Sequence, residues 1–231
     1  MGIAENLEQV RQRLAQAQRE YGRDAESVRL LAVSKTKPVQ ALQTAIDSGQ
    51  RAFGENYLQE ALDKIEYFAG TELEWHFIGP IQSNKTRAIA EHFDWVHSVD
   101  RLKIARRLSE QRPPGCAPLN LCIQVNVDDE SSKSGCRLEA LPELVAAINE
   151  LPNIRLRGLM AIPRPSDTES EQRKPFRQLA EALAQLRQSG YELDTLSMGM
   201  SADLEAAVAE GSTLVRIGTD IFGARDKPAT G

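Results

Sequence analysis

The stretch LLAVSKTKP, residues 30–38, takes the chain from a run of aliphatic residues directly into Ser34, Lys35, Thr36 and Lys37. A short continuous apolar run that ends in polar residues and a proline is typical of a buried β-strand. Lys35 would then close that strand. What a lysine does in this place depends on how many such strands the chain has and on how they are connected.

Seven further apolar runs follow, and amphipathic stretches separate many of them. Residues 138–148 and 176–186, for example, carry apolar residues at spacings of three and four, which predicts helices. An amphipathic helix with Leu7, Val10, Leu14 and Tyr21 on one face is expected before the first strand, ending near Gly22. The eight predicted strands are residues 29–35, 51–56, 75–79, 95–100, 120–127, 154–162, 195–199 and 213–219.

Strands that alternate with helices pair in parallel through right-handed crossovers, and eight of them can close into a barrel without exposed edges. The sequence therefore predicts an α/β fold, a single (β/α)8 barrel over residues 1–231 with an extra N-terminal helix. An open doubly wound sheet is the alternative. It is disfavoured because the chain has neither a G-x-G-x-x-G turn nor a Walker loop.

Composition excludes several classes of protein. Of 231 residues, 41% are hydrophobic and 26% charged, and the net charge of -5 comes with scattered basic residues, which argues against a nucleic-acid partner. No apolar run approaches the roughly 18 residues of a membrane span, and no secretory signal is recognisable, so we expect a cytoplasmic protein. Cys116, Cys122 and Cys136 lack C-x-x-C spacing, which predicts reduced thiols and no zinc site.

Polar residues gather where the predicted strands end, which is where barrels of this kind carry their chemistry. They are Lys35, Glu55 and Asn56, Gln124 and Asn126, the segment SMGMS at 197–201, and Arg216 with Gly218 and Thr219. A lysine at this mouth can be a solvated cation, a partner for a carboxylate, or a nucleophile toward a carbonyl. The third role needs a deprotonated amine, which desolvation or the charges of Lys37 and Arg216 would favour. The pattern leaves the three roles open.

The last two strand ends predict an anion site. We expect Ser201 to cap the N-terminus of a helix, and exposed amide groups there, the serine hydroxyl and the close backbone approach allowed by Gly218 would suit a phosphate. In the simpler alternative, Ser201 only caps its helix and Gly218 only turns the chain.

Five segments together resemble one family. AVSKTKP (32–38), FGENYLQE (53–60), EWHFIGPIQSNK (74–85), RGLMAI (157–162) and LSMGMSADLEAAVAEGSTLVRIGTDIFGAR (196–225) are similar to the YggS/PROSC family of pyridoxal phosphate homeostasis proteins, nearly from end to end. The resemblance implies a TIM barrel like the N-terminal domain of alanine racemase, monomeric or weakly associating, that carries pyridoxal 5'-phosphate as an aldimine on Lys35.

The same resemblance assigns the other cofactor contacts. Arg216 would face the ring nitrogen and Asn56 would lie against the pyridine ring, while Ser201, Gly218 and Thr219 would hold the phosphate. An arginine does not readily give up a proton, so the ring nitrogen would stay unprotonated and the cofactor would be a poor electron sink. This restrains carbanion chemistry.

Three functions are compatible with such a site: a carrier that delivers the cofactor to apoenzymes, a slow amino-acid racemase, and a regulatory module. Alanine racemase adds a C-terminal domain whose tyrosine is the second base, and this chain stops eight residues after Gly223, so we expect the carrier. The four tyrosines, Tyr21, Tyr57, Tyr67 and Tyr191, are explained by helix packing or loop positions.

The remaining candidates are single residues. His76 is expected to be a buried, hydrogen-bonded histidine, with support of the cofactor site as the alternative. His92 and His97 have no acidic partners at ligand spacing, so we expect no metal. Cys122 is expected to pack inside the barrel. Lys133 is either an ordinary loop lysine or a second amine that takes up the aldehyde by transimination.

Overall fold

Eight parallel strands form a closed barrel in the computed structural model, which describes residues 2–128 and 134–224. Each strand pairs with the next along the chain, and β8 closes the barrel onto β1 through the pairs Leu30 with Val215 and Leu31 with Arg216. The strands are β1 (Arg29–Val33), β2 (Ala52–Glu55), β3 (Glu74–Phe77), β4 (Trp95–Val99), β5 (Leu119–Gln124), β6 (Ile154–Met160), β7 (Thr195–Ser197) and β8 (Leu214–Ile217). The predicted barrel is confirmed, and the doubly wound alternative is wrong because both edges pair with each other.

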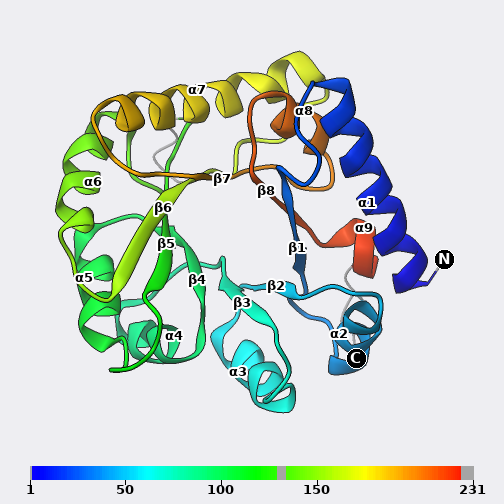
Figure 1. The fold of residues 1–231 in the computed structure, drawn as a ribbon, viewed down its shortest axis with the longest axis horizontal. Coiled ribbons are helices and arrows are strands. Elements are labelled where there is room, and N and C mark those ends of the chain that lie inside the picture. The colour runs from blue at the N-terminus through cyan, green and yellow to red at the C-terminus, as the bar shows by residue number, and fades with distance from the viewer. Residues whose placement is uncertain (1, 129–133, 225–231) are drawn as a thin grey trace, which may run out of the picture.

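Helices surround the strands on the outside (Figure 1). Each crossover carries a helix because a parallel partner can only be reached by returning over the sheet. The helices are α1 (Ile3–Glu20), α2 (Val39–Asp47), α3 (Leu58–Tyr67), α4 (Thr86–His92), α5 (Leu102–Gln111), α6 (Leu141–Asn149), α7 (Glu169–Gln188), α8 (Leu204–Ala209) and α9 (Thr219–Phe222), with 3-10 turns η1 (Ser83–Lys85) and η2 (Leu138–Ala140).

The extra N-terminal helix lies beside α8 and α9 (Figure 1). Leu7, Val10 and Leu14 are buried on its inner face, as the apolar spacing predicts, and the chain turns at Gly22 with a φ of 63°. Arg13 adds ion pairs to Glu205 and Asp220, so the helix is tied to the segment that follows β7 and β8. These ion pairs fasten α8 and α9, the helices that follow the last two strands, to the N-terminal helix.

Several predicted strands are too long at their carboxyl ends. Lys35, Asn56 and Asn126 were expected within strands but lie just beyond them. After β1 the backbone N–H of Ser34 still donates to the carbonyl oxygen of Gly54, and the chain then turns at Thr36, which adopts a left-handed conformation with a φ of 64°. These residues therefore belong to the turns that form one mouth of the barrel.

The interior of the barrel is only partly apolar. Trp95, Cys122 and Met160 pack together inside it, which confirms the packing role of Cys122, and burial raises the pKa of this thiol to about 12. All three cysteines are free thiols. The larger core lies between the strands and the surrounding helices. Among the helices of residues 2–128 and 134–224, none is long and apolar enough to cross a membrane.

Candidate functional site

A pocket of about 340 Å³ opens at the mouth formed by the strand ends, and we call it the mouth pocket. All six residues that the sequence assigned to a cofactor line it. The lining residues are Val33, Lys35, Thr36, Lys37, Asn56, Ile78, Ile162, Met200, Ser201, Ala202, Arg216, Gly218, Thr219 and Gly223. Three of them carry positive charge and none carries a carboxylate, so the pocket is suited to an anion.

Lys35 lies in the turn that follows β1, and hydrogen bonds fix the backbone on both sides of it. The carbonyl oxygen of Ser34 accepts from Lys64 Nζ at 2.8 Å, and the backbone N–H of Thr36 donates to Glu60 Oε1 at 2.6 Å. Both partners lie on α3. The lysine side chain is thus presented from a turn whose position is set by a neighbouring helix.

The cluster beneath this turn is ionic and buried. Lys64 is 3% exposed and lies 2.7 Å from Glu55 Oε1, which also accepts from the hydroxyl of Ser34 at 2.6 Å. Burial raises the pKa of Glu55, and the charge of Lys64 opposes that shift. Sequence reasoning missed the role of Lys64, although Glu60 and Lys64 stand at the i, i+4 spacing of a helical ion pair.

Arg216 is the buried cation of the mouth pocket. It is 4% exposed, and its guanidinium donates to Ser197 Oγ at 2.8 Å and to the carbonyl oxygen of Ala161 at 2.9 Å. Burial lowers its pKa to about 10, so it keeps its proton at neutral pH. Both acceptors are neutral, and the positive charge is therefore left available to the pocket.

Two buried oxygen atoms of the mouth pocket, Ser201 Oγ and Asn56 Oδ1, have no hydrogen-bond partner among the described residues. An unpaired buried polar atom costs about 1 to 3 kcal/mol, so atoms of this kind mark places where a ligand supplies the missing bond. Asn56 can occupy its position because Gly79 has no side chain: a Cβ there would lie 2.3 Å from the Asn56 carbonyl oxygen.

The predicted capping role of Ser201 is wrong. The N-cap of α8 is Asp203, whose carboxylate accepts from the backbone N–H of Met200 at 2.6 Å. This bond closes a turn over residues 200–203 and delays the helix to Leu204. The hydroxyl of Ser201 is consequently not used by the helix.

Gly218 and Thr219 line the same pocket from the start of α9. The glycine is partly explained by packing against β1, because a Cβ at this position would lie 3.2 Å from the carbonyl oxygen of Val33. Thr219 is exposed.

None of the three histidines lines this pocket. His76 is fully buried and contacts His97 at 2.8 Å, which confirms the predicted buried, hydrogen-bonded histidine. His92 is exposed at the end of α4. Within residues 2–128 and 134–224 no cluster of histidine, cysteine and acidic residues could hold a metal ion. Lys133 lies outside the described residues.

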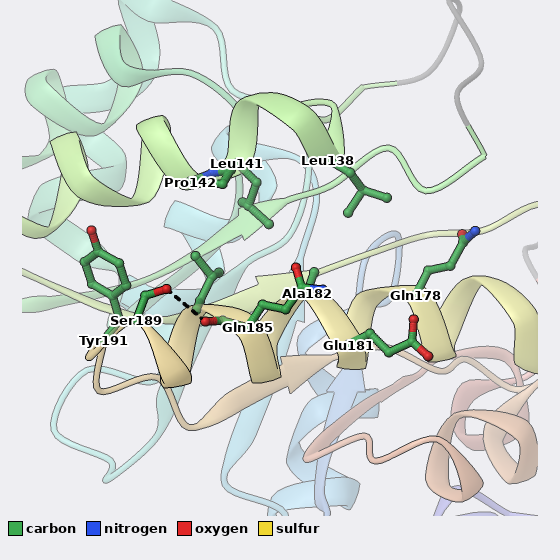
Figure 2. Close-up of a pocket in the computed structure, with 10 residues that line it drawn as sticks. Leu138, Leu141, Pro142, Gln178, Glu181, Ala182, Gln185, Ser189 and Tyr191 are labelled. Carbon is green, nitrogen blue, oxygen red and sulfur yellow. Dashed lines mark hydrogen bonds between the residues drawn. The ribbon is translucent and has the colours of Figure 1, made fainter.

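A second pocket, of about 440 Å³, lies outside the barrel between α6 and α7. Figure 2 shows Leu138 and Leu141 facing a row of α7 side chains that includes Ala182 and Gln185. Tyr191 lines this pocket, whereas no tyrosine lines the mouth pocket in the described part of the chain. The outer pocket lacks the convergent cations and unpaired polar atoms of the mouth pocket, which is therefore the better candidate.

Comparison with known proteins identifies the family. The family model of the alanine racemase N-terminal domain matches residues 5–226. A Pseudomonas aeruginosa protein named pyridoxal phosphate homeostasis protein is 62% identical over 224 residues, 97% of this chain and 96% of that protein. The chain belongs to the pyridoxal phosphate homeostasis protein family. An Escherichia coli K12 member of the family is 59% identical over 227 residues, 97% of each chain.

Solved structures agree with the family assignment. PipY of Synechococcus elongatus, solved with PLP bound, is 38% identical, with a TM-score of 0.84 over 96% of this chain and 100% of that one. Alanine racemase of Corynebacterium glutamicum shares the fold, with 18% identity and a TM-score of 0.70 over 99% of this chain and 62% of that one. The resemblance predicted from the sequence to the pyridoxal phosphate homeostasis proteins is confirmed.

Proposed function

We propose that this chain binds pyridoxal 5'-phosphate in the mouth pocket, as a Schiff base on Lys35, and delivers it to apoenzymes. The observation that carries the proposal is the convergence of Lys35, Arg216 and two unpaired buried oxygens in one cationic pocket. Family membership and the PLP-bound PipY structure support it. A single barrel domain acting as a monomer in the cytoplasm is part of the same proposal.

The residues of the pocket fit this cofactor chemically. When bound, pyridoxal phosphate would supply an aldehyde, and Lys35 would hold it through its amine as a C=N bond, with the release of one water molecule. The Ser201 hydroxyl can donate to the phosphate, with Gly218 and Thr219 beside it. Asn56 would lie against the ring, and Arg216 would donate to the ring nitrogen. The unpaired hydroxyl of Ser201 would thereby gain a partner from the phosphate.

The lining of the mouth pocket favours a carrier over a racemase. Racemisation needs two acid/base groups on opposite faces of the substrate carbon. Among the described lining residues, no tyrosine, histidine, cysteine, aspartate or glutamate is present beside Lys35. Lys37 donates to the carbonyl oxygen of Ala224 at 3.0 Å, which engages the other lysine of the pocket. A slow racemase remains the alternative outcome of the experiment below.

Two assays on the PLP-loaded protein separate the functions. We expect transfer of the cofactor to an apoenzyme in the presence of a scavenger for free pyridoxal phosphate, with a rate that rises with acceptor concentration. Transfer abolished by the scavenger would mean release rather than delivery. In deuterium oxide we expect alanine to keep its Cα proton. Exchange at typical enzyme rates, on the order of 1 to 10³ per second, would establish the racemase instead.

A further inference from the structure

A continuous line of polar side chains crosses the interior of the barrel from the mouth pocket to the opposite end. Arg216 on β8 contacts Ser197 Oγ on β7 at 2.8 Å, and Ser197 Oγ lies 2.7 Å from His97 Nδ1 on β4. His97 Nε2 lies 2.8 Å from His76 Nδ1 on β3, and His76 Nε2 lies 2.7 Å from Glu74 Oε1. We call these five residues the interior relay.

Four residues of the interior relay are buried, so their polar atoms depend on one another for hydrogen bonds. His76, His97 and Ser197 have no exposed surface and Arg216 is 4% exposed, so no water competes for their polar atoms. The ring of His76 stacks on Trp95 with an interplanar angle of 8°, which limits its rotation. Only Glu74, 35% exposed in its side chain, reaches the surface, where it pairs with Arg29.

The available donors and acceptors make the hydrogen bonds of the interior relay run in a single direction, from Arg216 to Glu74. A guanidinium has only donors, so Ser197 Oγ accepts from Arg216 and has its own proton left for His97 Nδ1. The proton of neutral His97 must then be on Nε2, from which it is donated to His76 Nδ1. His76 in turn donates from Nε2 to the carboxylate of Glu74.

The opposite direction is unfavourable. In that direction neutral His76 would carry its proton on Nδ1, and the lone pair of its Nε2 would face the carboxylate of Glu74. Adding a proton to either ring would place a third cation between those of Arg216 and Arg29. Glu74 and Asp94 offer negative charge to His76, and Asp203 offers it to Arg216. Burial lowers the pKa of both histidines. At His76 the bond to Glu74 opposes this shift and Arg29 adds to it, whereas at His97 the charges of His76, Arg216 and Arg29 all add to it. Both rings are therefore neutral.

We propose that Ser197, His97 and His76 are positioning residues, which hold the guanidinium of Arg216 toward the mouth pocket by a one-directional hydrogen-bond chain anchored on Glu74. That the guanidinium held in this way faces the ring nitrogen of pyridoxal phosphate rests on the proposed function. Among the described residues, the guanidinium of Arg216 donates to two neutral acceptors, Ser197 Oγ and the carbonyl oxygen of Ala161, while the carboxylate of Asp203 acts on it through its charge. Because His97 Nδ1 accepts the hydrogen bond donated by the Ser197 hydroxyl, a lone pair of the serine oxygen stays directed at the arginine.

The direction can be tested in the cofactor-free protein by nitrogen-15 NMR of the imidazole rings. We expect His76 and His97 to be neutral Nε2–H tautomers at pH 7, with His97 Nδ1 shifted by the hydrogen bond it accepts. Ser197→Ala should remove that shift from His97. An Nδ1–H tautomer on either ring, or a protonated His97, would overturn the proposal. This measurement on the wild-type protein does not depend on any variant folding or on any cofactor.

The positioning role is tested with the cofactor. Losing the oriented serine acceptor should weaken binding of pyridoxal phosphate to Ser197→Ala about fivefold, as expected for about 1 kcal/mol, and alter the absorption spectrum of the bound cofactor. Ser197→Thr keeps the hydroxyl and should restore both. Ser212→Ala is the matched control, since this buried hydroxyl donates only to backbone carbonyls.

Different results would contradict the positioning role and the proposed function. Equal affinity and spectra for Ser197→Ala and Ser212→Ala would overturn the positioning role while leaving cofactor binding intact. Absence of cofactor binding by the wild-type protein would overturn the proposed function, and the NMR tautomers would still decide whether the interior relay exists.

Discussion

Lys64 Nζ and Glu55 Oε1 lie 2.7 Å apart beneath the turn that presents Lys35. Both side chains are nearly inaccessible to solvent, and the ammonium group also donates to the carbonyl oxygen of Ser34. Desolvating two charges is expensive, and a buried pair is tolerated only when further hydrogen bonds complete its geometry. Here one of those bonds goes to Ser34, the residue that precedes Lys35, which couples the cluster to the mouth pocket.

Lys64→Met is expected to reduce the free energy of unfolding by about 3 to 5 kcal/mol, because it leaves Glu55 buried without its cation. Urea denaturation measures the change. The double variant Lys64→Met with Glu55→Leu should recover part of the loss, since no unpaired charge is left. Lys174→Met, in an exposed pair with Glu171, is the control and should cost less than about 1 kcal/mol. A similar small loss for Lys64→Met would contradict this account of the cluster.

Ser201→Ala should weaken pyridoxal phosphate binding about tenfold, because the hydroxyl is expected to donate a charge-assisted hydrogen bond to the phosphate. Binding of unphosphorylated pyridoxal should change little. Equilibrium titration with each ligand measures the difference, and Ser189→Ala, which removes an exposed hydroxyl at the end of α7, serves as control. Equal loss for both ligands would show that the hydroxyl does not contact phosphate.

Because His76 and His97 are buried in their neutral form, we expect the free energy of unfolding to fall in acid. The folded-state pKa values of His76 and His97 lie below the ordinary 6.5, so the unfolded chain binds more protons and stability falls as pH decreases below about 6.5. His97, whose pKa is lowered well below 6.5, should contribute a slope approaching about 1.4 kcal/mol per pH unit, and His76 should add to it in the same direction. Glu74, with its pKa lowered to about 2, stays ionised in this window: burial alone would raise that pKa, but His76 and Arg29 outweigh it.

Urea denaturation between pH 7 and 5 checks this prediction. His92→Gln, at an exposed position, should leave the slope unchanged, whereas His97→Gln should reduce it. A free energy of unfolding that does not vary over this range in the wild-type protein would show that the two rings are not held neutral.

The barrel and the gathering of the pocket residues could be predicted from the sequence because both depend on local signals. Apolar runs mark the strands, and parallel strands bring their carboxyl ends to one mouth, so Lys35 and Arg216 had to meet. The start of α8 could not be predicted in the same way. Ser201 and Asp203 are both good caps, and the choice depends on the turn that Asp203 makes with Met200.

The interior relay could not be predicted from the sequence at all. His97 and Ser197 are 100 positions apart, and their contact depends on strand register and on which face of each strand points inward. The sequence placed His97 in a strand but gave no means of pairing it across the barrel. The ionic cluster of Lys64, Glu55 and Glu60 was partly predictable, since the i, i+4 spacing of Glu60 and Lys64 can be read from the sequence.

The central claim is that Lys35 forms the Schiff base, and reductive trapping tests it most directly. Borohydride reduces the C=N bond to a stable secondary amine, so peptide mapping by mass spectrometry locates the pyridoxyl group. We predict that the PLP-loaded protein carries the group on Lys35, that Lys35→Ala traps little cofactor, and that Lys37→Met traps as much as the wild-type protein. A pyridoxyl group found chiefly on Lys37 or Lys133, or undiminished trapping by Lys35→Ala, would contradict the account.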